Sequence, residues 1–129
     1  MLDPVIRELA RGKNFSSISF HLPNGSIGTH VMWVGADDDH VLINTEVHRA
    51  KYKAIQANPN VTVVIWSSEN TYSYAEVRGK VTSEVRGPDA RASIDELSRK
   101  YTGGDYQPEI QSERVILKIT PDRQRSQGL

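Results

Sequence analysis

The sequence contains no cysteine, and this absence removes several kinds of chemistry at once. Disulfide bonds, thiolate metal sites and cysteine nucleophiles are all excluded. Long hydrophobic runs are also missing, because no stretch approaches the roughly 20 apolar residues that cross a membrane. The first residues, MLDPVIRELARGK, are typical of a helix and lack the apolar centre of a signal sequence. We therefore expect a cytoplasmic protein with no membrane segment.

The chain has no excess of charge of either sign, since 16 basic residues balance 16 acidic residues. No global field attracts nucleic acid or an anionic membrane, so any anion site must be local. Aromatic and basic residues are not interleaved, which argues against a nucleic-acid-binding barrel. Metal-ligand spacing is absent from the histidines, and no Ser-His-Asp triad, P-loop or complete glycine-rich dinucleotide motif is present. The histidines are His21, His30, His40 and His48.

The length of 129 residues fits one domain, which we expect to span 1–129. Hydrophobic residues make up only 37% of the chain, below the usual share for globular proteins. The core of such a chain is thin, and association with a second copy would bury more apolar surface.

Turn residues and hydrophobic periodicity predict a mainly β protein with flanking helices. Six mostly antiparallel strands with few helices favour a closed or split barrel. Gly79 interrupts an alternating segment, which predicts a bulge or a sharp bend there. The expected elements are a helix from Asp3–Pro4 to Gly12, strands at 15–22, 27–34 and 40–45, a short helix at 48–57, strands at 61–67 and 72–85, a helix from 87 to 101, and a last strand at 115–119 with a polar tail from Pro121.

Three basic residues, Arg49, Lys51 and Lys53, gather at the start of the short helix. Backbone N–H groups and the helix dipole favour an anion at that end, and arginine can bind phosphate with two hydrogen bonds. In a regular helix Arg49 and Lys53 share a face and Lys51 does not, so the three converge only on a group beyond the helix end. The alternative is an ordinary solvated helix face. Thr45 could meet the same anion, or it could cap the helix.

Aromatic residues supply a second candidate feature. Trp66, Tyr72 and Tyr74 could form a wall for a planar ligand, or Trp66 could serve packing alone. His30 could donate a proton because histidine titrates near neutral pH, although a lone strand histidine is more often structural.

Several segments, taken in order, resemble the pyridoxamine-phosphate-oxidase-like split β-barrel family, and within it the branch that uses the deazaflavin coenzyme F420. The most specific part is LINT, followed by R-x-K and then NP-x-V; the hairpin turn P-x-G is weaker alone. The matching pieces are NFSSISFHLPNGSIGTHVMWV (14–34), HVLINTEVHRAKYKAIQANPNVTVVIW (40–66), YSYAEVRGKV (72–81) and IDELSRKYTG (94–103).

This resemblance implies a homodimer with a cofactor groove at the subunit interface. Backbone groups of the strand that leads to Trp33 would contact the ring, and the segment from Ile43 to Lys51 would line the rest. The partner subunit would contribute residues around 66–74, and loops such as 103–112 would shape the substrate pocket. The resulting set of candidate cofactor-binding residues is Thr29, His30, Val31, Met32, Trp33, Ile43, Asn44, Thr45, Arg49, Ala50, Lys51, Lys53, Trp66, Tyr72 and Tyr74.

The activity that the resemblance implies is an F420-dependent reductase, in which the reduced deazaflavin gives a hydride to a small organic acceptor. A first alternative is an FMN-binding oxidoreductase of the same fold, because both cofactors share the phosphate and ribityl portion. A second alternative is a cofactor-binding dimer without turnover. No side chain in the sequence identifies itself as a catalytic acid or base.

Overall fold

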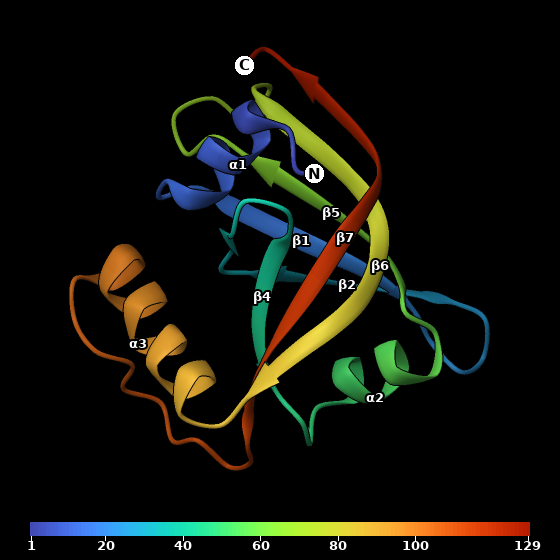
Figure 1. Cartoon of the computed structure of the whole chain (residues 1–129), viewed down its shortest axis with the longest axis vertical. Coiled ribbons are helices and arrows are strands. Elements are labelled where there is room, and N and C mark those ends of the chain that lie inside the picture. Colours follow the sequence, from blue (N-terminus) through green and yellow to red (C-terminus); the bar gives the residue numbers. More distant parts are fainter.

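A computed structural model describes all 129 residues. Its seven strands form one antiparallel sheet with the strand order β2-β1-β5-β6-β7-β4-β3, which curls into a barrel (Figure 1). The predicted mainly β split barrel is confirmed, with one strand more than expected because Gly35–Ala36 makes a short pairing with Val41–Leu42. The elements are α1 (Pro4–Arg11), β1 (Phe15–His21), β2 (Ile27–Met32), β3 (Gly35–Ala36), β4 (Val41–Glu46), α2 (Ala50–Ala57), β5 (Asn60–Trp66), β6 (Tyr74–Arg86), α3 (Pro88–Thr102) and β7 (Arg114–Gln127).

The core lies inside the curled sheet, where alternate residues of each strand point. Along β5 the side chains of Val61, Val63 and Ile65 are buried, while those between them are only partly covered. Val63 lies opposite Ile18 of β1 and Val77 of β6, so three strands meet at one level of the core. Full burial of an aliphatic side chain of this size stabilises a fold by roughly 1.5–3 kcal/mol.

The longest strands, β6 and β7, form a ribbon that bends around one side of the barrel (Figure 1). The predicted irregularity at Gly79 is confirmed, because the β6–β7 register shifts between Arg78 and Gly79. A Cβ atom at Gly79 would lie 2.1 Å from the carbonyl oxygen of Thr120, so only glycine fits there.

The expectation of a polar tail from Pro121 onward is wrong, because β7 continues to Gln127. Pro121 has no N–H to donate, which normally ends a central strand. Here Pro121 faces Gly79 at the register shift, where the hydrogen-bond ladder is already interrupted. The missing donor therefore removes no regular bond, and the polar residues beyond it pair with β6.

The local sequence explains where α1 begins and where α3 begins and ends, but it does not explain where α2 begins. Asp3 Oδ1 accepts a hydrogen bond of 3.0 Å from Val5 N, and Pro4 opens α1 as predicted. The alternative role of Thr45 as a helix cap is wrong, because Thr45 lies inside β4 and α2 starts only after Arg49. The third helix, α3, lies between Gly87 at φ +80° and Gly103 at φ +87°, both left-handed positions.

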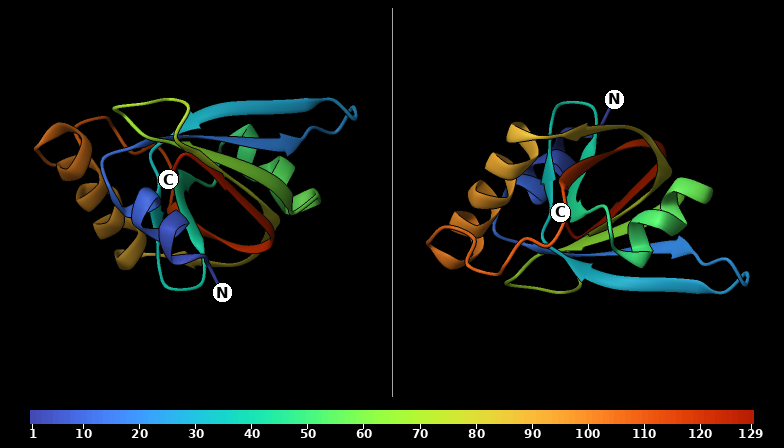
Figure 2. Two further views of the ribbon diagram at one scale, coloured as in Figure 1. Left: turned by 90° about the horizontal axis from the view of Figure 1, so that it is seen from above. Right: turned by 90° about the horizontal axis from the view of Figure 1, so that it is seen from below.

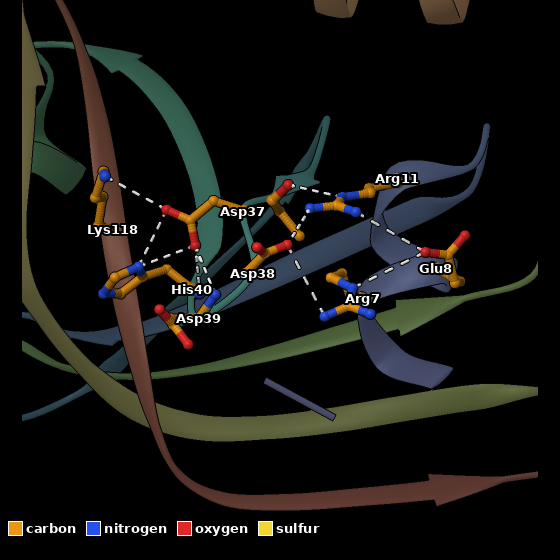
Figure 3. Close-up of polar contacts among 9 residues, drawn as sticks. Arg7, Glu8, Arg11, Asp37, Asp38, Asp39, His40 and Lys118 are labelled. Carbon is orange, nitrogen blue, oxygen red and sulfur yellow. Dashed lines mark hydrogen bonds and ion pairs between the residues drawn. The ribbon is translucent and has the colours of Figure 1, made fainter. Parts of the chain in front are cut away.

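α1 and α3 lie on one side of the barrel and α2 lies on the other, and the β1–β2 hairpin projects beyond it next to α2 (Figure 2). α1 is joined to the β3–β4 turn by polar contacts (Figure 3). Arg11 Nη2 lies 3.1 Å from Asp38 Oδ1, and Arg11 Nε donates to the carbonyl of Ala36. Asp37 in the same turn contacts both His40 and Lys118, which ties the turn to β7.

Lys100 on α3 joins three elements through its ammonium group. Its Nζ donates to the carbonyl oxygens of Val34, Ala10 and Arg11 at 2.6, 3.1 and 3.3 Å. Burial lowers the pKa of Lys100 to about 8. These contacts fix the C-terminal half of α3 beside α1 and the end of β2. No helix has both the length and the apolar character that spanning a membrane would require.

Candidate functional site

A cavity of about 460 Å³ opens where the ends of β2 and β4 meet α3 and the loop that follows it. Its size lies within the range of small-molecule sites. No group of three or more histidine, aspartate or glutamate residues that could hold a metal ion occurs. The cavity is lined by Phe15, Val31, Met32, Trp33, Asn44, Thr45, Arg49, Ile94, Leu97, Tyr106, Pro108 and Arg114.

Aromatic rings form one wall of this cavity. Trp33 stacks on Tyr101 with ring centroids 5.3 Å apart and planes 6° from parallel, and Tyr106 meets Trp33 edge-on at 6.1 Å. The hydroxyl of Tyr101 donates to the carbonyl of Asn14 and accepts from the backbone N–H of Val34. The indole is therefore held in one orientation, and a flat ligand meets a rigid surface.

Glu46 is the buried acidic centre of the site. Its Oε1 accepts hydrogen bonds from the backbone N–H groups of Gln111 and Ser112 at 2.7 and 3.0 Å. Its Oε2 lies 3.3 Å from Arg49 Nη2 and 3.6 Å from Arg114 Nη1. Burial alone would raise the pKa of Glu46, but these N–H donors and the two arginines outweigh it and lower the pKa. Glu46 is thus a carboxylate that holds the loop and both arginines in place.

Lys51 is buried with only 2% of its surface exposed. Its Nζ has one partner, the Sδ atom of Met32 at 2.8 Å, and a thioether is a weak acceptor for an ammonium group. Burial, followed by the charges of Arg49 and Arg114, lowers the pKa of Lys51 to about 8. Met32 covers this ammonium group on the cavity side, and methionine is flexible enough to move aside.

Arg114 begins β7 and reaches the cavity from its inner side. Its Nε donates to Asn44 Oδ1 at 2.9 Å, and Asn44 in turn donates to the carbonyl of Ala90 at the start of α3. The guanidinium lies over the ring of Tyr106, 5.3 Å from its centroid. Burial lowers the pKa of Arg114, although its charge is retained because guanidinium stays protonated in proteins.

The charges around the cavity do not balance. Arg49, Lys51 and Arg114 are three cations, and Glu46 is the only carboxylate that contacts any of them. Two positive charges therefore remain without a counter-charge. Arg49 is half exposed to solvent, but the Lys51 ammonium group is buried, and a buried charge without a counter-charge is costly unless an anion binds. The hydroxyl of Thr45 is a further group that could bond an anion, because its Oγ1 is buried and has no hydrogen-bond partner.

Part of the predicted set is brought together here. The cavity contains six of the predicted residues, and Lys51 lies directly behind one of them, Met32. Residues of β2, β4 and the start of α2 converge as expected, although they are separated in sequence. The six are Val31, Met32, Trp33, Asn44, Thr45 and Arg49.

Other predicted residues lie elsewhere in the chain. Lys53 is exposed, Ile43 belongs to the core, and Ala50 is at the surface. Thr29 bonds Ser19 across the β1–β2 pair, and His30 packs edge-on against Phe20. Trp66 contacts Phe15, the hydroxyl of Tyr74 donates to Gln127, and Tyr72 is exposed. None of these side chains lines the cavity of its own chain.

His30 has no partner that would make it a proton donor. Burial and then the charges of Lys51 and Arg49 lower its pKa, which disfavours the protonated form that could donate a proton. Its ring contacts Phe20 with centroids 5.1 Å apart, which is a packing role.

Several lining residues were not in the predicted set. Tyr106 and Pro108 come from the loop that was expected to shape a substrate pocket. Arg114 stands between a polar loop and an apolar strand, which was the only local signal for a buried cation. The others depend on the position of α3 and have no short-range signal. The missed residues are Phe15, Ile94, Leu97, Tyr106, Pro108 and Arg114.

Comparisons with known proteins agree with this architecture. The family model described as pyridoxamine 5'-phosphate oxidase matches residues 2–128. A search of curated proteins finds no match. Among solved structures, an F420 reductase superimposes with a TM-score of 0.82 at 26% identity, covering 96% of this chain and 98% of the other.

Two more distant structures share the fold. General Stress Protein 26 from Bacillus anthracis superimposes with a TM-score of 0.71 at 23% identity, over 95% of this chain and 90% of the other. A conserved hypothetical protein from Mycobacterium tuberculosis gives a TM-score of 0.72 at 18% identity, over 98% and 84%.

Proposed function

The chain belongs to the pyridoxamine 5'-phosphate oxidase family, and on that premise we propose that it is an oxidoreductase that binds coenzyme F420 in the cavity beside Trp33. The observation that carries this proposal is the excess of two positive charges around Arg49, Lys51 and Arg114. The similarity to an F420 reductase supports the choice of F420 over FMN.

The residues present fit a phosphate-bearing cofactor. Arg49 is half exposed at the start of α2 and presents a planar fork that suits a phosphate oxygen pair. Lys51 supplies a buried point charge, and Thr45 supplies a hydroxyl with no partner inside the chain. The phosphate half of the cofactor binds to these three groups.

The cofactor ring has a suitable surface on the other side. β2 is the end strand of the sheet and pairs only with β1, so the backbone groups along its outer edge have no strand partner. These groups can bond the ring edge, while Trp33, fixed by Tyr101, offers an apolar face.

The chemistry resides in the cofactor, which exchanges a hydride with an organic acceptor when bound. The chain positions the two reactants and keeps water away from the ring through Phe15, Trp33 and Tyr106. No side chain of the cavity is assigned a proton transfer.

A second copy of the chain completes this site in the proposal. Val31 and Ile27 on β2 are 71% and 65% exposed, although both are apolar, and Phe15 beside the cavity is 40% exposed. Exposed apolar residues on an edge strand mark a surface that a partner can cover. Trp66, Tyr72 and Tyr74 would then reach the cavity of the partner subunit.

Replacing Val31 by aspartate is expected to turn the dimer into a monomer and to weaken cofactor binding at least about tenfold, because a charge would be buried at the interface. Sedimentation velocity and a fluorescence titration measure the two effects. Val5→Asp is the matched control, since Val5 is also exposed and apolar but lies on α1. A V31D protein that remains a dimer would remove β2 from the interface.

The direct test of the function is a titration of the ligand-free protein with F420 and, separately, with FMN. Quenching of the fluorescence of Trp33 and Trp66 reports binding, since Trp33 lines the cavity. We expect F420 to bind at least about tenfold more tightly than FMN, and the loaded protein to reduce an unsaturated or quinone-like acceptor.

The titration separates the alternatives clearly. Tighter binding of FMN would show that FMN is the cofactor, and the protein would then be an FMN-binding oxidoreductase of the same fold. Binding without turnover of any acceptor would leave a cofactor-binding dimer. Absence of binding for both cofactors would refute the proposal.

A further inference from the structure

The cavity has a second half that the phosphate and ring contacts do not use. Ile94 and Leu97 of α3, together with Tyr106 and Pro108 of the following loop, form its outer wall. All four present mainly apolar surface, and the ring of Tyr106 is held against both Trp33 and Arg114. This half therefore suits a flat, apolar molecule.

Arg114 is one of the two charged residues that line the cavity, and its position is fixed. The Nε atom is committed to Asn44, and Nη1 lies 3.6 Å from Glu46. Tyr106 contacts the guanidinium through both its ring and its hydroxyl, and Glu46 is the only carboxylate within ion-pair distance of it. The side chain is only 5% exposed, so its charge is not balanced by bulk water.

Glu46 does not neutralise Arg114, because the same carboxylate already receives Arg49 and two backbone N–H groups. With Nε bonded to Asn44, the two terminal NH2 groups of this guanidinium remain. Enclosed by apolar walls, they are matched by a planar ligand group of one negative charge. Carboxylate has this shape and charge, whereas a phosphate dianion needs more donors than this side of the cavity offers.

We infer that Arg114 is a substrate-binding residue that recognises a carboxylate on a flat, apolar hydride acceptor seated between Trp33, Tyr106 and α3. The role of this ligand as hydride acceptor rests on the proposed function, but the binding of an aromatic carboxylate does not. Arg49 and Lys51 serve the cofactor phosphate in this arrangement, and Arg114 serves the acceptor.

The test uses two probes that share one aromatic body, 2-naphthoate and 2-naphthamide, titrated into the ligand-free protein by calorimetry. Only the first carries a carboxylate. We expect the wild-type protein to bind naphthoate about tenfold more tightly than naphthamide. In R114Q the two probes should bind equally, because glutamine keeps a hydrogen-bond donor and removes the charge. R114K should recover only part of the preference, because lysine keeps the charge but not the planar pair of donors.

Two controls locate the effect. R123Q removes an exposed arginine from the same strand and should leave the preference unchanged. K51M should also leave it unchanged, which distinguishes the acceptor subsite from the phosphate subsite. Equal affinity of the wild-type protein for the two probes would overturn the inference without any variant. A preference that persists in R114Q or disappears in K51M would do the same.

The result of the naphthoate test does not depend on whether the protein binds F420 or FMN. A protein that binds neither F420 nor FMN but prefers naphthoate through Arg114 would contradict the proposed function and support this subsite. A protein that binds F420 but shows no preference would do the reverse.

Discussion

Replacing Gly79 by alanine is expected to lower the free energy of unfolding by roughly 3 kcal/mol or more, which for a domain of this size lowers the Tm by about 10 °C or more. The added methyl group would lie 2.1 Å from the carbonyl oxygen of Thr120. That oxygen belongs to the backbone of β7, so the ribbon itself must shift, and no side chain can move to relieve the contact.

The matched control for Gly79 is Gly104→Ala, because a Cβ atom at Gly104 would meet nothing within 4 Å. Urea unfolding and differential scanning calorimetry of both variants give the comparison. Equal stability losses for the two variants would show that the close approach of β6 and β7 is absent in solution.

Replacing Lys51 by methionine is expected to weaken cofactor binding by about 10- to 100-fold, as removal of a hydrogen bond to a charged group does. The same change should not destabilise the ligand-free protein. Lys51 Nζ is buried with only a thioether as partner, and methionine fills a similar volume without a charge. Cofactor binding is thus expected to weaken while the stability of the ligand-free protein is kept, which separates a ligand-binding role of Lys51 from a structural one.

The pH dependence of stability gives a second measure of Lys51. Its pKa falls from 10.5 to about 8 in the folded protein, chiefly through burial. Between these two values the unfolded chain holds a proton that the folded chain has lost, so the free energy of unfolding rises with pH in that window. The full rise corresponds to about 3 kcal/mol at most. Cofactor affinity should fall over the same window, because the ammonium charge is lost.

The comparison of wild type with K51M isolates this contribution. Lys100 also has a pKa of about 8, but it is present in both proteins and cancels in the difference. Urea unfolding below pH 8 and near pH 10.5 should show a steeper rise for wild type than for K51M. Parallel curves would mean that Lys51 is solvated in the ligand-free protein.

The strand pattern of the fold was largely predictable, because alternation along β1, β5 and β6 reflects local burial. Gly79 could be predicted as an irregularity from its position in an alternating segment. The extension of β7 beyond Pro121 could not, since it depends on a distant register shift that places Pro121 opposite Gly79. A rule for proline based on local sequence gives the wrong answer when the partner strand is irregular.

The site was predictable where its residues adjoin a recognisable motif. Asn44, Thr45 and Arg49 follow one another closely, and the resemblance placed the segment that contains them along the cofactor groove. Arg114 and Tyr106 enter through the packing of α3, which the chain fixes by the bonds from Asn44 to Ala90 and from Lys100 to Val34. Long-range contacts of this kind leave no periodic trace in the sequence.

The two end strands of the sheet, β2 and β3, do not pair with each other, which leaves a seam, and the cavity lies at the β2 side of it. Amide hydrogens of β5, which has strand partners on both sides, are therefore expected to exchange slowly with deuterium, while those on the outer edge of β2 exchange fast. The strands whose hydrogen bonds maintain the barrel are thus different from the strand whose edge contacts ligands. Residues along the seam can be substituted over evolutionary time with little loss of hydrogen bonding in the barrel, so one framework can acquire new ligands without being rebuilt.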